Sequence, residues 1–104
     1  MTKAFYSLVG MKHRGTEGLV KALPAGEALT LIRESNNKHD SSAVQVWGRG
    51  QHLGYVKATQ VHPIAVRLDA LIERTKLAPK AVLLPGKLTF DGGGWPMIEI
   101  EETP

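Results

Sequence analysis

The order of apolar and polar residues along the chain predicts a series of short strands. In segment 27–33, Leu29 and Leu31 fall on one side, and Thr30 and Ile32 fall on the other. This two-residue period is typical of a strand with one buried face, and segment 43–47 alternates in the same way. Apolar runs bounded by turn-forming residues predict four more strands: 4–11, 53–56, 81–90 (interrupted at Pro85-Gly86) and 96–101.

One stretch has the period of a helix instead. Its apolar residues recur at i, i+3, i+4, i+7, i+10 and i+11, which puts them on one side of a helix: Val61, Ile64, Ala65, Leu68, Leu71 and Ile72. Because proline is tolerated only in the first helical turn, Pro63 places the start near 60–62. We therefore expect one main helix at about 60–75. A short helical turn is expected at about 16–23, ended by Pro24 and Gly26.

Together these elements predict a mainly β fold. Glycine-rich turns at 48–50 and 92–94 are suited to hairpins. Six short strands and one main helix favour a small antiparallel six-stranded barrel of the OB-like or SH3-like kind, with the helix packed on it. The sequence contains no internal repeat or linker, so residues 1–104 are expected to form one domain.

The charge pattern points to an anionic partner. The chain has a net charge of +3, and three of its ten acidic residues lie in the last six positions. The remainder is therefore more basic, which suits a polyanion but serves solubility equally well. There is no cysteine, no apolar run long enough to span a membrane and no apolar leader at the N-terminus. These features predict a cytoplasmic protein with no membrane contact.

Common catalytic and metal-binding signatures are missing. Gly86-Lys87 is followed by leucine, and position 81 is alanine, so this is not a phosphate-binding P-loop. The four histidines have neither cysteine partners nor i, i+4 spacing. His39 next to Asp40 suggests a general base, but no activatable nucleophile is evident nearby. We therefore expect no metal, no cofactor and no enzymatic activity of the chain by itself.

Three segments carry a family resemblance. The strand ending in Arg33-Glu34 is followed by a loop, Ser35-Asn36-Asn37-Lys38-His39-Asp40-Ser41-Ser42, and then by alternating aliphatic residues. About ten residues later comes Leu53-Gly54-Tyr55-Val56-Lys57, which leads into the main helix, and the chain opens with Phe5-Tyr6-Ser7-Leu8-Val9-Gly10. The order and spacing of these segments resemble a HIRAN domain over roughly residues 4–75.

The resemblance implies a modified OB fold that binds single-stranded DNA and holds its free 3′ end in a pocket. It also implies work in DNA repair or replication-fork processing, because such domains occur alone or fused to helicase-like ATPases and nucleases. The expected partners are thus single-stranded DNA ending in a 3′-hydroxyl and a helicase-like ATPase or nuclease on another chain. One alternative is a protein-interaction adaptor that captures an extended peptide on an exposed edge strand.

By resemblance, the loop supplies four of the DNA-binding residues. Asp40 matches the aspartate that accepts a hydrogen bond from the terminal hydroxyl, and its charge would repel a phosphate there. Asn37 matches an asparagine that bonds a base edge or the backbone, although both residues also suit simple turn formation. His39 stands where the family has a stacking tyrosine. Lys38 replaces a proline, and it could contact a phosphate.

Six further candidates come from the strands and the last hairpin. Phe5 or Tyr6 matches an aromatic residue that stacks on a terminal base; strand neighbours point in opposite directions, so one should face the core unless both are core residues. Tyr55 and Lys57 match an aromatic or histidine and a lysine near the backbone contacts. Trp95 matches a late aromatic residue near the pocket. Arg33 is a candidate for contacting a phosphate, although it could equally be an ordinary solvated arginine on the surface. Trp47 matches no family role and is either a core residue or a second stacking platform.

Overall fold

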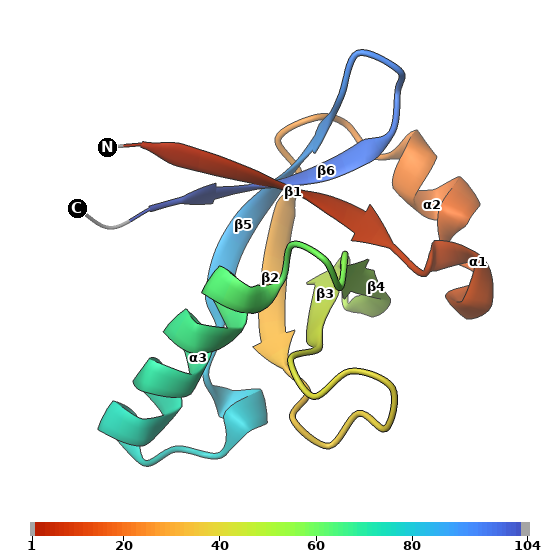
Figure 1. Ribbon diagram of the computed structural model, residues 1–104. Helices are drawn as coiled ribbons and strands as arrows, with labels where there is room; N and C mark the ends of the chain where they lie inside the picture. The colour runs from red at the N-terminus through yellow and green to blue at the C-terminus, as the bar shows by residue number, and fades with distance from the viewer. Residues whose placement is uncertain (1, 103–104) are drawn as a thin grey trace.

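Six antiparallel strands close into a barrel in the order β1-β4-β3-β2-β5-β6 (Figure 1). The computed structural model describes residues 2–102. The strands are β1 (Lys3–Val9), β2 (Ala28–Arg33), β3 (Val44–Gly48), β4 (Gln51–Val56), β5 (Leu84–Phe90) and β6 (Pro96–Glu101). The helices are α1 (Met11–Arg14), α2 (Glu17–Ala22), α3 (His62–Thr75) and the 3₁₀ helix η1 (Pro79–Ala81). The predicted fold class, a mainly β six-stranded barrel with one main helix, is confirmed.

The inward faces of the strands form the core, as the alternation predicts. Leu29 and Leu31 of β2 are 2% and 0% exposed, and Val44 and Val46 of β3 are both fully buried. Thr30 and Ile32, on the opposite face of β2, are only half-buried. This second face matters for function, because it leaves a continuous outer surface of polar and aromatic side chains on β4, β3 and β2.

The main helix begins at His62, with Pro63 in its first turn, and ends at Thr75. Ile64, Ala65 and Leu68 are buried, and the helix packs beside β2. Among residues 2–102, no helix has both the length and the apolar character needed to cross a membrane. The short helical turn expected at 16–23 is α2, over Glu17–Ala22.

Two boundaries differ from the sequence-based expectation. The first strand ends at Val9, two residues early, because Gly10 has a φ of +82° and turns the chain into α1. The strand expected at 81–90 begins only at Leu84, after η1, and runs through Pro85-Gly86 without the expected interruption. Pro85 pairs with Thr30 of β2, but pairing with β6 begins only at Lys87, so the missing N–H of proline breaks no ladder bond on that side.

A close approach between β1 and β4 explains a glycine of the resembling motif. A Cβ on Gly54 would lie 2.3 Å from the carbonyl oxygen of Val9, so only glycine allows the two strands to pair here. The next residue, Tyr55, pairs with Val9 on one side and with Gln45 of β3 on the other. Gly54 thereby places Tyr55 at the seam between the end of β1 and β3.

Candidate nucleic-acid interface

The loop between β2 and β3, residues 34–43, is ordered by its own side chains. Asn37 Oδ1 accepts hydrogen bonds from the backbone N–H groups of His39 (2.8 Å) and Asp40 (3.0 Å). Asp40 Oδ1 accepts one from the N–H of Ser42 at 2.9 Å. These are Asx-type turns, so the turn-forming interpretation of both residues applies. Among residues 2–102, Asp40 Oδ2 accepts no hydrogen bond, which leaves one carboxylate oxygen for a ligand.

Arg33 anchors the base of this loop to the main helix. Its side chain is only 8% exposed, and it lies 2.9 Å (Nε to Oδ1) from Asp69 of α3. The same guanidinium donates to the carbonyl oxygens of Ser41 (2.7 Å) and Ala43 (3.1 Å). The structure thus places Arg33, predicted as a phosphate contact, in internal bonds. Arg49, in the turn between β3 and β4, is exposed but forms a two-bond pair with Glu27.

Glu34 connects the loop to the barrel wall. Its Oε1 accepts hydrogen bonds from the Tyr55 hydroxyl at 2.9 Å and from the side-chain amide of Gln45. Its Oε2 accepts one from Asn37 Nδ2 at 2.7 Å. The indole N–H of Trp47 extends the chain of bonds by donating to Gln45 Oε1 at 2.8 Å. Because every donor in this network has an acceptor, the loop and β4 are held in one arrangement.

Three rings lie next to one another on the outer face of β3 and β4. The Trp47 and His52 rings are stacked, with centroids 5.5 Å apart and planes 10° from parallel. His52 then meets Tyr55 edge to face, with centroids 5.0 Å apart. We call Trp47, His52 and Tyr55 the aromatic row. Aromatic rings on a strand surface are the usual platform on which proteins stack unpaired bases.

Burial and hydrogen bonding set the protonation of this surface. Burial is the largest influence on Glu34 and opposes its ionisation, but the bonds from Gln45, Tyr55 and Asn37 together lower its pKa below 4.5. Burial, and then the charge of Arg14, lower the pKa of His52. Burial, and then the bond to Glu34, raise the pKa of Tyr55. At neutral pH the network therefore contains an ionised Glu34 with a neutral His52 and Tyr55.

The sequence interpretation missed the basic turn α1, which the structure places beside the aromatic row. Arg14 Nε donates to the carbonyl oxygen of His52 at 2.8 Å, and Lys12 and His13 are exposed on the same turn. A Cβ on Gly10 would lie 3.5 Å from the Tyr55 ring. The signal available in the sequence was the basic cluster Lys12-His13-Arg14, which directly follows the predicted first strand at 4–11 and was assigned to no element.

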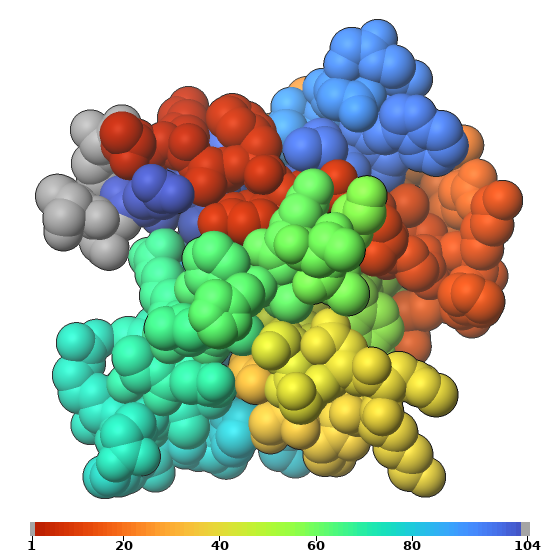
Figure 2. Space-filling model, viewed as in Figure 1, coloured from red at the N-terminus to blue at the C-terminus, as the bar shows by residue number. Residues whose placement is uncertain are grey.

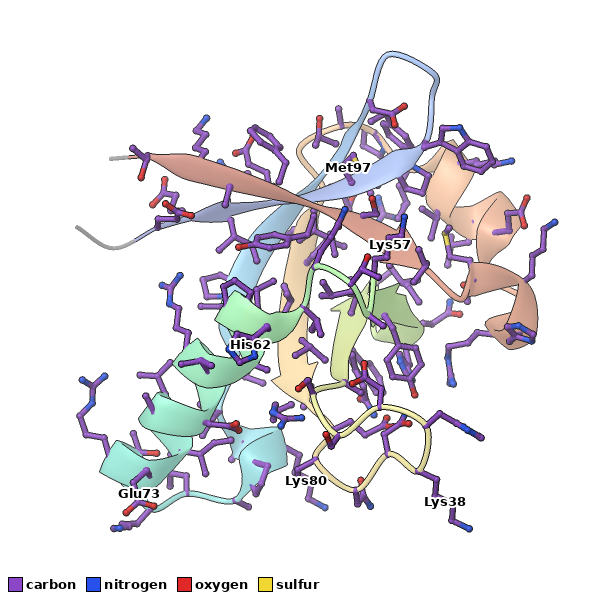
Figure 3. The ribbon with its side chains drawn as sticks, viewed as in Figure 1. Lys38, Lys57, His62, Glu73, Lys80 and Met97 are labelled. Atoms are coloured by element: carbon purple, nitrogen blue, oxygen red, sulfur yellow. The ribbon has the colours of Figure 1, made fainter. Side chains whose placement is uncertain are left out.

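The loop and α1 lie on one side of the molecule. Figure 2 shows loop 34–43 (yellow) and the α1 region (red-orange) as separate lobes, with part of the β4 region between them. In Figure 3, Lys38 extends outward from the loop, whereas Lys57 lies close to β1. Both side chains belong to exposed residues. Hydrogen bonds through Glu34 join Tyr55 to the loop that contains Asn37, His39 and Asp40, whereas Lys57 lies apart from that loop, near β1.

The two aromatic residues of β1 lie elsewhere. Tyr6 packs against the core and lines a cavity of about 200 Å³ with Pro63 and Arg67. Its pKa is raised by burial and then by Glu102. Phe5 points outward, is 52% exposed and pairs with Glu99 of β6. The expectation that one faces the core is therefore met, but neither joins the loop and the aromatic row.

Trp95 lies at the tip of the β5–β6 hairpin and is 64% exposed. It borders a groove of about 320 Å³ whose other walls include Gly10, Lys12, His13 and Lys21. The groove thus shares Gly10 and α1 with the surface around Tyr55. Asp91 fixes the hairpin, since its Oδ1 accepts the N–H groups of Gly93 and Trp95. An exposed indole beside basic side chains is suited to stacking on a base.

Within the described part of the chain, no three His, Asp or Glu side chains gather in a way that could hold a metal ion.

Each of the six strands pairs with two neighbours around the closed barrel. The adaptor hypothesis needs an open edge strand to capture a peptide, and the pairing leaves such an edge in the first half of β1, which meets β4 at Leu8 and Val9 alone.

Comparison with known proteins identifies the family. The chain resembles the crystal structure of a protein from Lactobacillus plantarum, with a TM-score of 0.64, 22% sequence identity and coverage of 96% of this chain and 100% of that one. It also resembles the crystal structure of the HIRAN domain of human HLTF, with a TM-score of 0.51, 20% identity and coverage of 96% and 77%. No curated protein matches the chain. At these identities, the two structures support the fold alone.

The family model named HIRAN domain matches residues 1–79, which is most of the chain. The match includes β1, α1, loop 34–43, the aromatic row and α3, and it stops before β5 and β6. HIRAN domains are known as nucleic-acid-binding modules. The chain is therefore a member of the HIRAN domain family.

Proposed function

We propose that this chain binds the 3′-hydroxyl end of single-stranded DNA on the surface formed by loop 34–43, Tyr55 and α1. The observation that carries the proposal is the hydrogen bonding of the Asp40 carboxylate. One of its carboxylate oxygens is fixed by the N–H of Ser42, and the other accepts no bond within residues 2–102. A fixed carboxylate with one open oxygen accepts a hydrogen bond from a terminal hydroxyl and repels a phosphate at the same position.

An aromatic ring bonded to the loop and another within the loop supply the stacking surface. Tyr55 is held by its bond to Glu34, and His39 is exposed two residues after Asn37, which fixes its backbone. A base stacked between or against such rings contributes about 1–3 kcal/mol. Trp95 extends this surface across the groove that it shares with α1.

Basic side chains surround the same surface and suit the phosphates that lead to the terminal nucleotide. Lys12 lies on α1, Lys38 on the loop and Lys57 after β4, and all three are exposed. Lysine and arginine contacts to phosphates provide affinity without sequence preference. Recognition in this proposal therefore depends on the strand end and on stacking rather than on base identity.

We also propose that the chain binds without cutting, as a module in DNA repair or replication-fork processing whose catalytic partner is a helicase-like ATPase or a nuclease on another chain. Incubation of the purified chain with end-labelled single-stranded DNA and Mg²⁺ tests the first part. Intact DNA after prolonged incubation is expected, and shortened products that scale with protein concentration would contradict it.

Fluorescence anisotropy tests the binding proposal directly. Two labelled oligonucleotides that differ only in a 3′-hydroxyl or a 3′-phosphate are titrated with the wild-type chain and with Asp40→Asn. The amide keeps the oxygen that accepts from Ser42 but removes the charge, so the turn is retained while phosphate repulsion is lost. We expect the wild type to prefer the hydroxyl and Asp40→Asn to lose that preference.

The control for net charge is Glu73→Gln. This variant removes one negative charge from the far end of α3, where Glu73 pairs only with Lys76 in the described residues. It should retain the preference for the hydroxyl. Equal, salt-dependent binding of both oligonucleotides by the wild type would reduce the chain to a general single-strand binder, and no binding at low salt would refute the proposal.

A further inference from the structure

A groove with one aromatic wall lies on the outer face of β2 and β3, at the far end of the aromatic row from loop 34–43. Its volume is about 310 Å³. We call it the Trp47 slot, and its lining includes Ala28, Thr30, Ile32, Trp47, Arg49 and Leu83. None of these residues belongs to the surface proposed above for the strand end.

The strand register defines the shape of the slot. Trp47 of β3 pairs with Thr30 of β2, and Thr30 pairs in turn with Pro85 of β5. Leu83, which immediately precedes β5, is 56% exposed and lines the groove. Two strand spacings, roughly 10 Å, therefore separate the aromatic wall from the β5 side. Because stacked rings prefer centroids 4.5–7 Å apart, this gap accepts one planar ring beside Trp47.

The Trp47 ring is fixed in a position that leaves one face for a ligand. One face stacks on His52, and the indole N–H is bonded to Gln45. Because His52 lies on the β4 side and Thr30 on the β2 side, the second face is directed toward the slot. A ring that is already held by two partners loses little freedom when a base stacks on it.

Two further observations identify the occupant as part of a nucleic acid. The aromatic row leads from Tyr55 through His52 to Trp47 at the slot, with ring centroids separated by 5.0 and 5.5 Å. At the slot's other side, Arg49 has a φ of +53°, a left-handed conformation that an arginine adopts only at some cost. Its pairing with Glu27 leaves the side chain 55% exposed, so a cation borders the slot at the point where a strand would leave it.

We propose that the Trp47 slot binds a second nucleobase of the same single strand, upstream of the 3′-terminal nucleotide. This inference rests on the proposed function, since it extends that binding site. The strand would run from Asp40 past Tyr55 and His52, insert one base against Trp47, and pass Arg49. The chain would then contact an internal base as well as an end.

The length of the DNA and two variants test this proposal. A dinucleotide bound at the loop is too short to extend past Tyr55 and His52 to Trp47, whereas an octanucleotide is long enough to reach the slot. In anisotropy titrations we expect Trp47→Leu to weaken octanucleotide binding at least fivefold, the lower limit for loss of a stacked base. Affinity for the dinucleotide, followed by backbone NMR shifts at residues 37–40, should fall less than affinity for the octanucleotide, because Trp47 reaches the loop only through its bond to Gln45.

Leu83→Glu provides a second variant that leaves the aromatic row intact. Leu83 is exposed, so the substitution should fold normally, and the new charge lies on the rim of the slot opposite Trp47, where it would repel a phosphate. Its matched control is Leu77→Glu, because Leu77 is 52% exposed but lies after α3, outside the slot. We expect Leu83→Glu to weaken octanucleotide binding at least fivefold and Leu77→Glu to bind like the wild type.

The outcomes separate the two proposals. If neither Trp47→Leu nor Leu83→Glu weakens binding of the octanucleotide, the slot proposal is wrong and end binding remains. The same holds if the loss of affinity is equal for the octanucleotide and the dinucleotide. Failure of the wild type to bind either DNA would overturn both. As a direct readout, the indole N–H signal of Trp47 should shift with the octanucleotide and stay in place with the dinucleotide.

Discussion

Removing the Glu34 carboxylate is the most informative perturbation of the site, because one side chain connects the loop to the barrel. Glu34→Ala deletes the acceptor for three side-chain donors, those of Gln45, Tyr55 and Asn37. Burial of Glu34 is only partial, so water replaces part of each lost bond. Bonds to a charged group contribute about 1.5–3 kcal/mol each when buried; because water solvates the exposed part of Glu34 and replaces much of each bond, we expect a total loss of only about 2 kcal/mol.

For a domain of this size, each 1 kcal/mol lowers Tm by about 4–8 °C, so Glu34→Ala should melt roughly 8–16 °C below the wild type. The Tm of Glu34→Gln should lie between those of the wild type and Glu34→Ala. It keeps one acceptor oxygen but presents an amide to Asn37, whose own oxygen is occupied by the loop N–H groups. Thermal melting followed by circular dichroism measures both shifts.

The same variants should weaken the binding of a 3′-hydroxyl oligonucleotide, because Asn37 and Asp40 lose their link to Tyr55. Glu73→Ala is the stability control, since that exposed helix pair should contribute no more than about 0.5 kcal/mol. If Glu34→Ala and Glu34→Gln both melt within about 2 °C of the wild type and bind DNA equally well, then the network does not organise the site as argued.

Four further outcomes follow from the structure. Because the pKa of Glu34 is lowered on folding, its stabilisation is present above pH 4.5 and lost as the pH falls further, so the Tm difference between wild type and Glu34→Gln should shrink between pH 6 and 3. Arg33→Gln should cost about 2–3 kcal/mol in urea unfolding, since it leaves Asp69 and two loop carbonyls without their donor; stability equal to the wild type would show that the anchor is unimportant. Leu68→Ala, at a fully buried helix position, should cost 2–5 kcal/mol in the same assay, and a cost below 1 kcal/mol would contradict the packing of α3 on the barrel. Lys57→Gln should reduce the slope of log affinity against log salt by about 0.7 if it contacts one phosphate, whereas an unchanged slope would remove it from the path of the strand.

The sequence predicted the parts of the fold that depend on hydrophobic period. The α3 stripe and the alternation of β2 and β3 are buried as expected, because burial of one face is what produced those patterns. It failed where a single backbone angle decided the outcome. The run 4–11 is mostly apolar up to its last residue, and only the positive φ of Gly10 ends β1 and begins α1.

Pro85-Gly86 is the second case in which local rules were misleading. Both residues disfavour a strand, yet glycine suits position 86 because a Cβ there would be tightly placed, 3.2 Å from the Glu99 carbonyl oxygen and from side chains of Ile98 and Leu31. That close packing of β5 against its neighbours depends on barrel closure. Sequence pattern alone contains no information about a distance between strands far apart in the chain.

The sequence predicted several residues of the candidate site but not the hydrogen bonds that connect them. Asn37, His39, Asp40 and Tyr55 were named from the resemblance, and the structure brings them together. The link through Glu34 and Gln45 was not foreseen, because it joins residues 11 and 21 positions apart across two strands. Phe5 and Tyr6 were placed in the site by their position on the first strand, but the contacts of β1 with β4 begin only at Leu8.

The most direct test of the account is an NMR titration of the ¹⁵N-labelled chain with an octanucleotide ending in a 3′-hydroxyl. We predict that the backbone signals of residues 37–40, Tyr55 and α1 shift in a saturable way. The signals of Phe5 and of the cavity beside Tyr6 and Arg67 should remain unchanged. Shifts confined to the Phe5 and Arg67 region, or no shifts at low salt, would contradict the assignment of this surface as the nucleic-acid interface.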